Sequence, residues 1–64
     1  MTKLKQIREN ANITQAKLSE LSGVNLRTLQ YYEQGYKDIN KAQGSTLLKI
    51  AQVLNCQIED LLEE

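Results

Sequence analysis

The sequence contains no histidine and no proline, and its one cysteine is Cys56. Histidine is the commonest general base and metal ligand, so its absence argues against hydrolytic and zinc chemistry. A single thiol without a histidine partner is a poor candidate nucleophile, and it excludes an internal disulfide. We therefore expect no catalytic residue, no metal, no cofactor and no small-molecule substrate, and the chain is predicted not to be an enzyme.

Long apolar runs are missing as well. Nowhere do about 18 consecutive apolar residues occur, as a membrane-spanning helix needs, and the N-terminus lacks the apolar run of a signal peptide. Cys56 lies in the run from Val53 to Ile58, where a small buried apolar residue is expected. An unpaired thiol also fits a reducing compartment. These features predict a cytoplasmic protein without a membrane partner.

Charge is balanced in total but not along the chain, which has eight basic and eight acidic residues. Four of the acids are in the last six residues, so residues 1–58 carry eight positive and four negative charges, a net charge of +4. The basic character belongs to the body of the chain and the acidic character to its tail. This distribution keeps a polyanionic partner possible despite the zero sum.

Helix formers dominate and no stretch alternates between apolar and polar residues, so the predicted fold class is all-α. Five helices are expected in one compact domain, residues 1–64, and the initial methionine and lack of a linker indicate a whole protein. Caps and glycines predict helices after Thr2 to about 11, after Thr14 to 22, at 26–34 after Asn25, after Asn40 to 54, and at 58–63. Gln43 completes a capping-box pattern with Asn40.

Residues 15–34 form the central unit: a helix carrying Leu18 and Leu21, a tight turn containing Gly23, and a second helix. Two helices joined by so short a turn must cross at a steep angle. The small Ser19 falls where they approach closely. The buried side is supplied by Leu18, Val24, Leu29 and Tyr32.

The stretch 14–25 (TQAKLSELSGVN), followed by Leu29, Tyr32, Glu33 and Gly35, resembles the Cro/phage-repressor (Xre-type) helix-turn-helix family of transcriptional regulators. Residues 47–56 and 58–62 are similar to that family's last two helices, so the resemblance covers essentially the whole chain. Ser19 stands where alanine is usual, and the segment 35–47 is longer than is common. The resemblance implies a five-helix repressor-like domain whose third helix lies in the DNA major groove.

The exposed face of the predicted third helix carries Arg27, Gln30, Tyr31 and Gln34, and no acid interrupts it. Arginine can donate two hydrogen bonds to guanine, glutamine can pair with adenine, and an apolar group such as Leu26 can touch a thymine methyl. Asn25 directly precedes this helix and is also expected to bind DNA. Any surface helix turns polar residues outward, but on a turn of this geometry the pattern favours base recognition.

Phosphate contacts are expected on either side of that helix. Thr14 and Gln15 begin the second helix, where side chains and free backbone donors face an anion. By the resemblance, Gln15 is the strongest candidate. Tyr36, Lys37 and also Lys41 could hold the DNA backbone beyond the third helix, although a single lysine is more often an ordinary solvated charge.

Two charges fall on faces that should be buried. Arg8 lies on the apolar stripe of the first helix, and Glu33 lies beside Leu29 and Tyr32 on the third. An unpaired charge there would be costly. Opposite signs on surfaces that must pack together predict a structural salt bridge, and the resemblance implies the same pair.

The sequence therefore predicts a sequence-specific regulator, of the repressor type, that binds double-stranded DNA and is bacterial or phage-type and nucleoid-associated when bound. A homodimer on a two-fold operator would place its recognition helices about 34 Å apart. Exposed apolar clusters usually mark an interface. The expected dimer surface consists of Leu48, Val53, Leu61 and Leu62.

The alternative belongs to another class, a protein-interaction module of the same fold that binds a partner protein as an anti-repressor or antitoxin does. Its support is the zero net charge and the apolar or aromatic surface of Leu26, Tyr31 and Tyr36. Salt separates the two hypotheses, because DNA binding weakens steeply as counterions are added and an apolar protein interface changes little.

Overall fold

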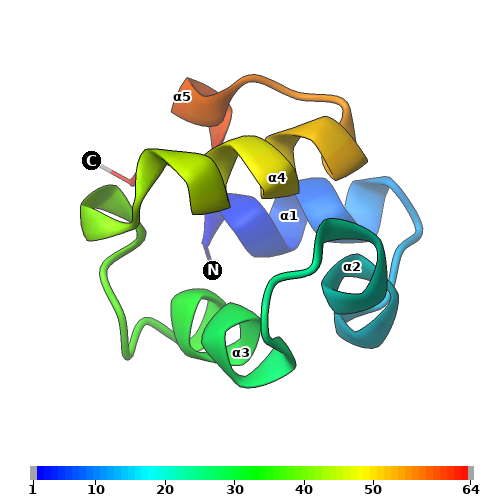
Figure 1. Ribbon diagram of the computed structural model, residues 1–64, viewed down its shortest axis with the longest axis horizontal. Coiled ribbons are helices and arrows are strands. Elements are labelled where there is room, and N and C mark those ends of the chain that lie inside the picture. The colour runs from blue at the N-terminus through cyan, green and yellow to red at the C-terminus, as the bar shows by residue number, and fades with distance from the viewer. Residues whose placement is uncertain (1, 64) are drawn as a thin grey trace.

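A computed structural model describes residues 2–63, and within that range the chain forms helices and no strand, which confirms the all-α prediction (Figure 1). The elements are α1 (Lys3–Asn10), α2 (Gln15–Ser22), α3 (Leu26–Gln34), the short 3₁₀ helix η1 (Ile39–Lys41), α4 (Gly44–Leu54) and α5 (Ile58–Leu61). Met1 and Glu64, which enter the expectations on the chain's extent and tail charge, lie outside the described residues.

The first three helices begin and end as the sequence predicts. Thr2, Thr14 and Asn25 each accept a hydrogen bond from a backbone N–H in the first turn that follows, at 3.2, 3.1 and 2.8 Å. Gly23 and Gly35 end α2 and α3 with φ of +75° and +83°, a left-handed backbone that favours glycine. These local bonds satisfy backbone groups that a helix end leaves unpaired.

The predicted start of the fourth helix is wrong. Asn40 lies inside η1, and α4 begins at Gly44 after Gln43, whose side chain makes no capping bond. η1 has its own cap, Asp38, whose Oδ1 accepts a hydrogen bond from the Asn40 N–H at 3.0 Å. Ile39 is buried, so η1 is anchored to the core.

The Asn40 side chain has another partner, the backbone of Glu63. Its Oδ1 accepts a hydrogen bond from the Glu63 N–H at 2.8 Å, and its Nδ2 donates one to the Glu63 carbonyl. The Glu63 carboxylate in turn accepts the Lys3 backbone N–H at 2.6 Å. α5 therefore ends at Leu61, short of the predicted residue 63, because the chain after it pairs with η1 and α1.

The hydrophobic core lies between the helices. α1 and α4 lie between α3 and α5, and α2 packs against α3 and α4 (Figure 1). Leu4, Leu18, Leu29, Ile50 and Leu61 are the core's most deeply buried large side chains. Leu61 was expected on a dimer surface, but its exposed fraction is 0%, so that part of the expectation is wrong. A four-residue helix can bury only one side, and Leu61 occupies it.

Candidate nucleic-acid interface

Two serine hydroxyls hold the turn between α2 and α3. The Ser19 hydroxyl of α2 donates to the carbonyl of Val24, which lies in the turn, at 2.6 Å. The buried Ser22 hydroxyl donates to the Leu18 carbonyl at 2.6 Å and accepts the Val24 N–H at 3.2 Å. The sequence pointed to Ser19 near this turn but not to Ser22, which bridges the end of α2 to the turn. α3 is thereby fixed in angle relative to α2.

The outer side of α3 carries most of the residues expected to read bases. Leu26, Arg27 and Gln34 are exposed, and Gln30 and Tyr31 are half-buried. Leu29, Tyr32 and Glu33 face inward. Asn25 is exposed, but its Oδ1 is used to cap the helix, which leaves its amide N–H groups as the free donors.

An aromatic pair stands at the C-terminal end of α3. The Tyr31 and Tyr36 rings meet edge to face, with centroids 5.9 Å apart and planes at 73°. The backbone N–H groups of Tyr36 and Lys37 both donate to the Tyr31 carbonyl, at 2.9 and 3.3 Å. The loop after α3 is therefore folded back on the helix, with Tyr36 and Lys37 exposed. The sequence named all three residues without indicating this contact.

Thr14 and Gln15, expected to contact phosphates at the start of α2, differ in the hydrogen bonds that their side chains make within the protein. The Thr14 hydroxyl accepts the Lys17 N–H and keeps its own O–H free to donate. Gln15 is half-buried, and its Nε2 donates to Glu33 Oε1 at 2.9 Å. The first residue of α2 is thus bonded directly to α3. Lys41, in contrast, lies on η1, which is distant in the chain from Gln15 and follows the helix that carries Glu33.

Arg8 and Glu33 are brought together in a buried ion pair. Arg8 Nε donates to Glu33 Oε2 at 2.6 Å and Nη2 donates to Oε1 at 3.0 Å. Hydrogen bonding to Glu33 holds the pKa of the Arg8 guanidinium above its ordinary value, against the opposing effect of burial. Arg8 Nη1 also donates to the Ile13 carbonyl at 2.8 Å. One ion pair therefore links α1, the segment before α2, and α3.

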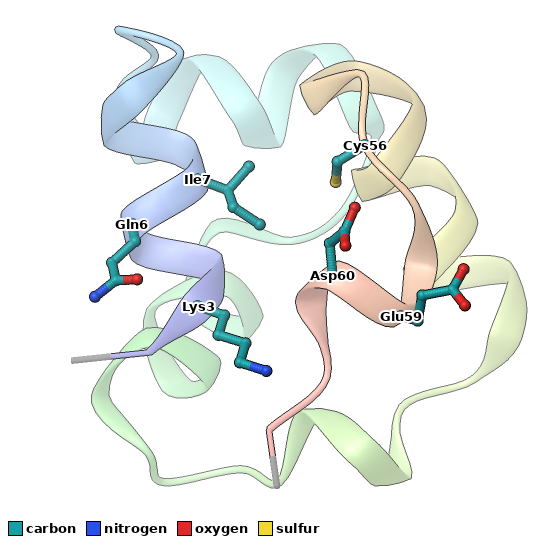
Figure 2. Close-up of a pocket in the computed structure, with 6 residues that line it drawn as sticks. All are labelled: Lys3, Gln6, Ile7, Cys56, Glu59 and Asp60. Carbon is teal, nitrogen blue, oxygen red and sulfur yellow. The ribbon is translucent and has the colours of Figure 1, made fainter.

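A hollow in the described surface lies elsewhere, between α1 and α5, and is lined by Lys3, Gln6, Ile7, Cys56, Glu59 and Asp60. Figure 2 shows Ile7 and Cys56 pointing toward one another across it, while Gln6 points away. Burial, and to a smaller extent the charge of Asp60, raises the pKa of the Cys56 thiol. The thiol is half-buried and protonated at neutral pH, as a structural side chain would be.

Among the residues that the structure describes, no group of three or more histidine, cysteine, aspartate or glutamate side chains could hold a metal ion. None of the helices in residues 2–63 has the length and apolar character to cross a membrane.

A family model described as helix-turn-helix, of the Cro/C1 type, matches residues 4–61, which is nearly the whole chain. No curated protein matches the sequence.

Proposed function

Because the chain belongs to the Cro/C1-type helix-turn-helix family of DNA-binding transcription regulators, we propose that it is a sequence-specific repressor that reads the DNA major groove with α3. The observation that carries this proposal is the inward direction of Glu33. It is the one acidic residue of α3, and it is buried against Arg8. The outer face of α3 therefore offers donors and apolar groups to DNA without a carboxylate that would repel phosphates.

The outer face divides into two parts by chemistry. Arg27, in the first turn of α3, is exposed and can make the two parallel hydrogen bonds that guanine accepts. Gln30 can pair with adenine, and Leu26 can pack on a thymine methyl. Recognition helices read bases chiefly with their N-terminal residues. We assign base reading to this end, together with the amide of Asn25.

Contacts with the DNA backbone are assigned to both flanks of α3. On one side, the Thr14 hydroxyl, the Gln15 amide and the N-terminus of α2 present donors to a phosphate. On the other side, Tyr36 and Lys37 project from the folded-back loop, where Tyr31 braces the Tyr36 ring. Such contacts fix position and register but carry no sequence information.

The proposal includes a homodimer of this single domain on a two-fold operator in the cytoplasm. The dimer is supported by Leu48 on α4, which is 48% exposed to solvent. Val53 and Leu62 are half-buried and pack against the core. An isolated exposed leucine is ordinary, but a cluster marks an interface. Sedimentation should show dimers at high protein concentration, and Leu48→Glu should shift them to monomers. A wild-type monomer with and without DNA would remove the dimer from the proposal.

Selection of bound duplexes from a random DNA pool tests the central proposal. We expect a short enriched sequence, with two-fold symmetry if the dimer forms. The affinity for that sequence should fall steeply with added salt, because binding releases counterions from the phosphates. Recovery of unenriched sequences only, with no measurable affinity, would contradict sequence-specific DNA binding.

A second candidate function, the binding of a partner protein through the same surface, is favoured by one observation. Tyr36 is 75% exposed and Leu26 is 37% exposed, so two large apolar side chains lie on the α3 side. If this surface binds a partner protein and not DNA, added salt should change the affinity for that protein little.

A further inference from the structure

The Glu33 carboxylate accepts three side-chain hydrogen bonds from two different elements. Oε2 accepts Arg8 Nε at 2.6 Å, and Oε1 accepts both Arg8 Nη2 at 3.0 Å and Gln15 Nε2 at 2.9 Å. Only 2% of the Glu33 side chain is exposed. It therefore cannot touch DNA itself, and any effect on DNA binding must pass through its neighbours.

The same ion pair holds the start of α2 from two directions. The guanidinium of Arg8 binds the carbonyl of Ile13, just before the Thr14 cap, and the carboxylate of Glu33 binds the Gln15 side chain, just after it. These bonds fix the position of the phosphate-facing end of α2 relative to α3, which carries the base-reading residues. Two contacts on opposite sides of a cap restrict both its position and its rotation.

The chemistry of Glu33 also determines which way the Gln15 amide faces. A carboxylate can only accept hydrogen bonds, so Gln15 must turn its N–H₂ group toward it. The second N–H of that group remains free to donate. Without the carboxylate, the amide could turn over and present its carbonyl oxygen to a phosphate, which repels it.

We propose that Glu33 is a positioning residue for DNA binding, which orients the Gln15 amide so that one N–H is held inside and the other is presented to a phosphate. This inference rests on the proposed function. It adds a role to an ion pair whose other role is stability, and it predicts that Glu33 and Gln15 affect DNA affinity as a unit.

A double-mutant cycle on DNA affinity tests the coupling. Glu33→Asp keeps the charge opposite Arg8 but withdraws the carboxylate by one methylene group from Gln15. Gln15→Ala should lower the affinity of the wild type about tenfold on every duplex, as expected for one hydrogen bond to an anion. In the Glu33→Asp background the further loss should be less than about twofold, because the contact is already lost. Each variant is measured where circular dichroism shows it folded.

Glu20 offers a matched control, since it is an exposed acid of α2 that pairs with Lys17 at 3.2 Å. In a Glu20→Asp background, Gln15→Ala should still lower affinity about tenfold. The same tenfold loss in the Glu33→Asp background would overturn the positioning role and leave DNA binding intact. No loss from Gln15→Ala in the wild type would remove both the phosphate contact and the positioning role. Absence of any duplex binding would overturn the proposed function, and this inference with it.

A spectroscopic measurement on the wild type decides the question if Glu33→Asp fails to fold. In the free protein, one Gln15 side-chain amide proton should resonate downfield and exchange slowly, because it is bonded to Glu33. Addition of the selected duplex should shift the other amide proton and leave the first in place. If both side-chain amide protons resonate as in a solvated glutamine and exchange fast, or if neither shifts with DNA, the inference is overturned.

Discussion

Arg8 and Glu33, 25 residues apart in the chain, meet in a two-pronged ion pair with Nε–Oε2 at 2.6 Å and Nη2–Oε1 at 3.0 Å. Their side chains are 10% and 2% exposed. Such a planar pairing is the geometry in which a guanidinium binds a carboxylate most strongly. The pair joins α1 to α3, so the placement of α3 depends on it.

Glu33→Ala should destabilise the domain by about 3–5 kcal/mol, because it leaves the Arg8 charge buried without its partner. Against the small total stability of a domain of this size, that loss should unfold much of the population. Urea denaturation followed by circular dichroism measures it. Glu20→Ala is the control, since the exposed Lys17–Glu20 pair should contribute no more than about 1 kcal/mol. Overlapping curves for Glu33→Ala and wild type would contradict the packing of α1 against α3.

The sequence predicted those parts of the fold whose causes are local. Thr2, Thr14 and Asn25 bond to N–H groups two or three residues away, so capping patterns predict them. The Asn40 cap failed because the true partner of that side chain is Glu63, 23 residues away, and no local pattern indicates it.

The candidate site divides in the same way. The outward face of α3 follows from helical periodicity, and the opposite charges of Arg8 and Glu33 indicated their meeting. The hydrogen bond from Gln15 to Glu33 spans 18 residues and depends on the crossing angle of α2 and α3. Spacing along one helix carries no information about such an angle, so only the structure reveals that Gln15 and Arg8 donate to the same oxygen of Glu33.

Gly35→Ala should destabilise the domain by about 1–2 kcal/mol, because a Cβ is unfavourable at its φ of +83°. Nothing lies within 4 Å of that added Cβ, so the cost is conformational and not a clash. Gly44→Ala is the matched control. Its surroundings are equally open but its backbone is outside the left-handed region, so it should stabilise by about 0.4–1 kcal/mol. Thermal melts that rank the two variants the other way would contradict this.

Stability should fall at alkaline pH through the Cys56 thiol, whose pKa is raised in the folded protein by burial and by Asp60. Above about pH 8.5 the unfolded chain loses the thiol proton while the folded protein still holds it, so unfolding becomes more favourable. The contribution is complete below that pH and disappears as pH rises through the folded pKa. Cys56→Ala should lack this part of the decline, because the variant has no thiol at this position to lose a proton. Parallel curves of stability against pH would contradict the shift.

The roles proposed for Arg27 and Gln15 predict different effects on DNA affinity. Arg27 is exposed in the first turn of α3, so Arg27→Ala should change stability by no more than about 0.5 kcal/mol. It should lower affinity for the selected duplex by about 1–3 kcal/mol and relax the preference at one base pair, a G·C pair. Gln15→Ala should lower affinity for every duplex alike, because a phosphate contact does not distinguish bases.

Binding of both variants to the selected duplex and to its single-base variants separates these outcomes. If Arg27 reads a base, the wild type should discriminate at one position where Arg27→Ala does not, and the two proteins should bind the altered duplex with similar affinity. If Arg27 only contacts the DNA backbone, its removal lowers the affinity for all duplexes equally. Binding should then release about one counterion fewer, so that affinity depends less steeply on salt concentration. If neither variant changes affinity, the DNA surface does not include the start of α2 and α3, and the exposed Leu26 and Tyr36 favour a protein partner there.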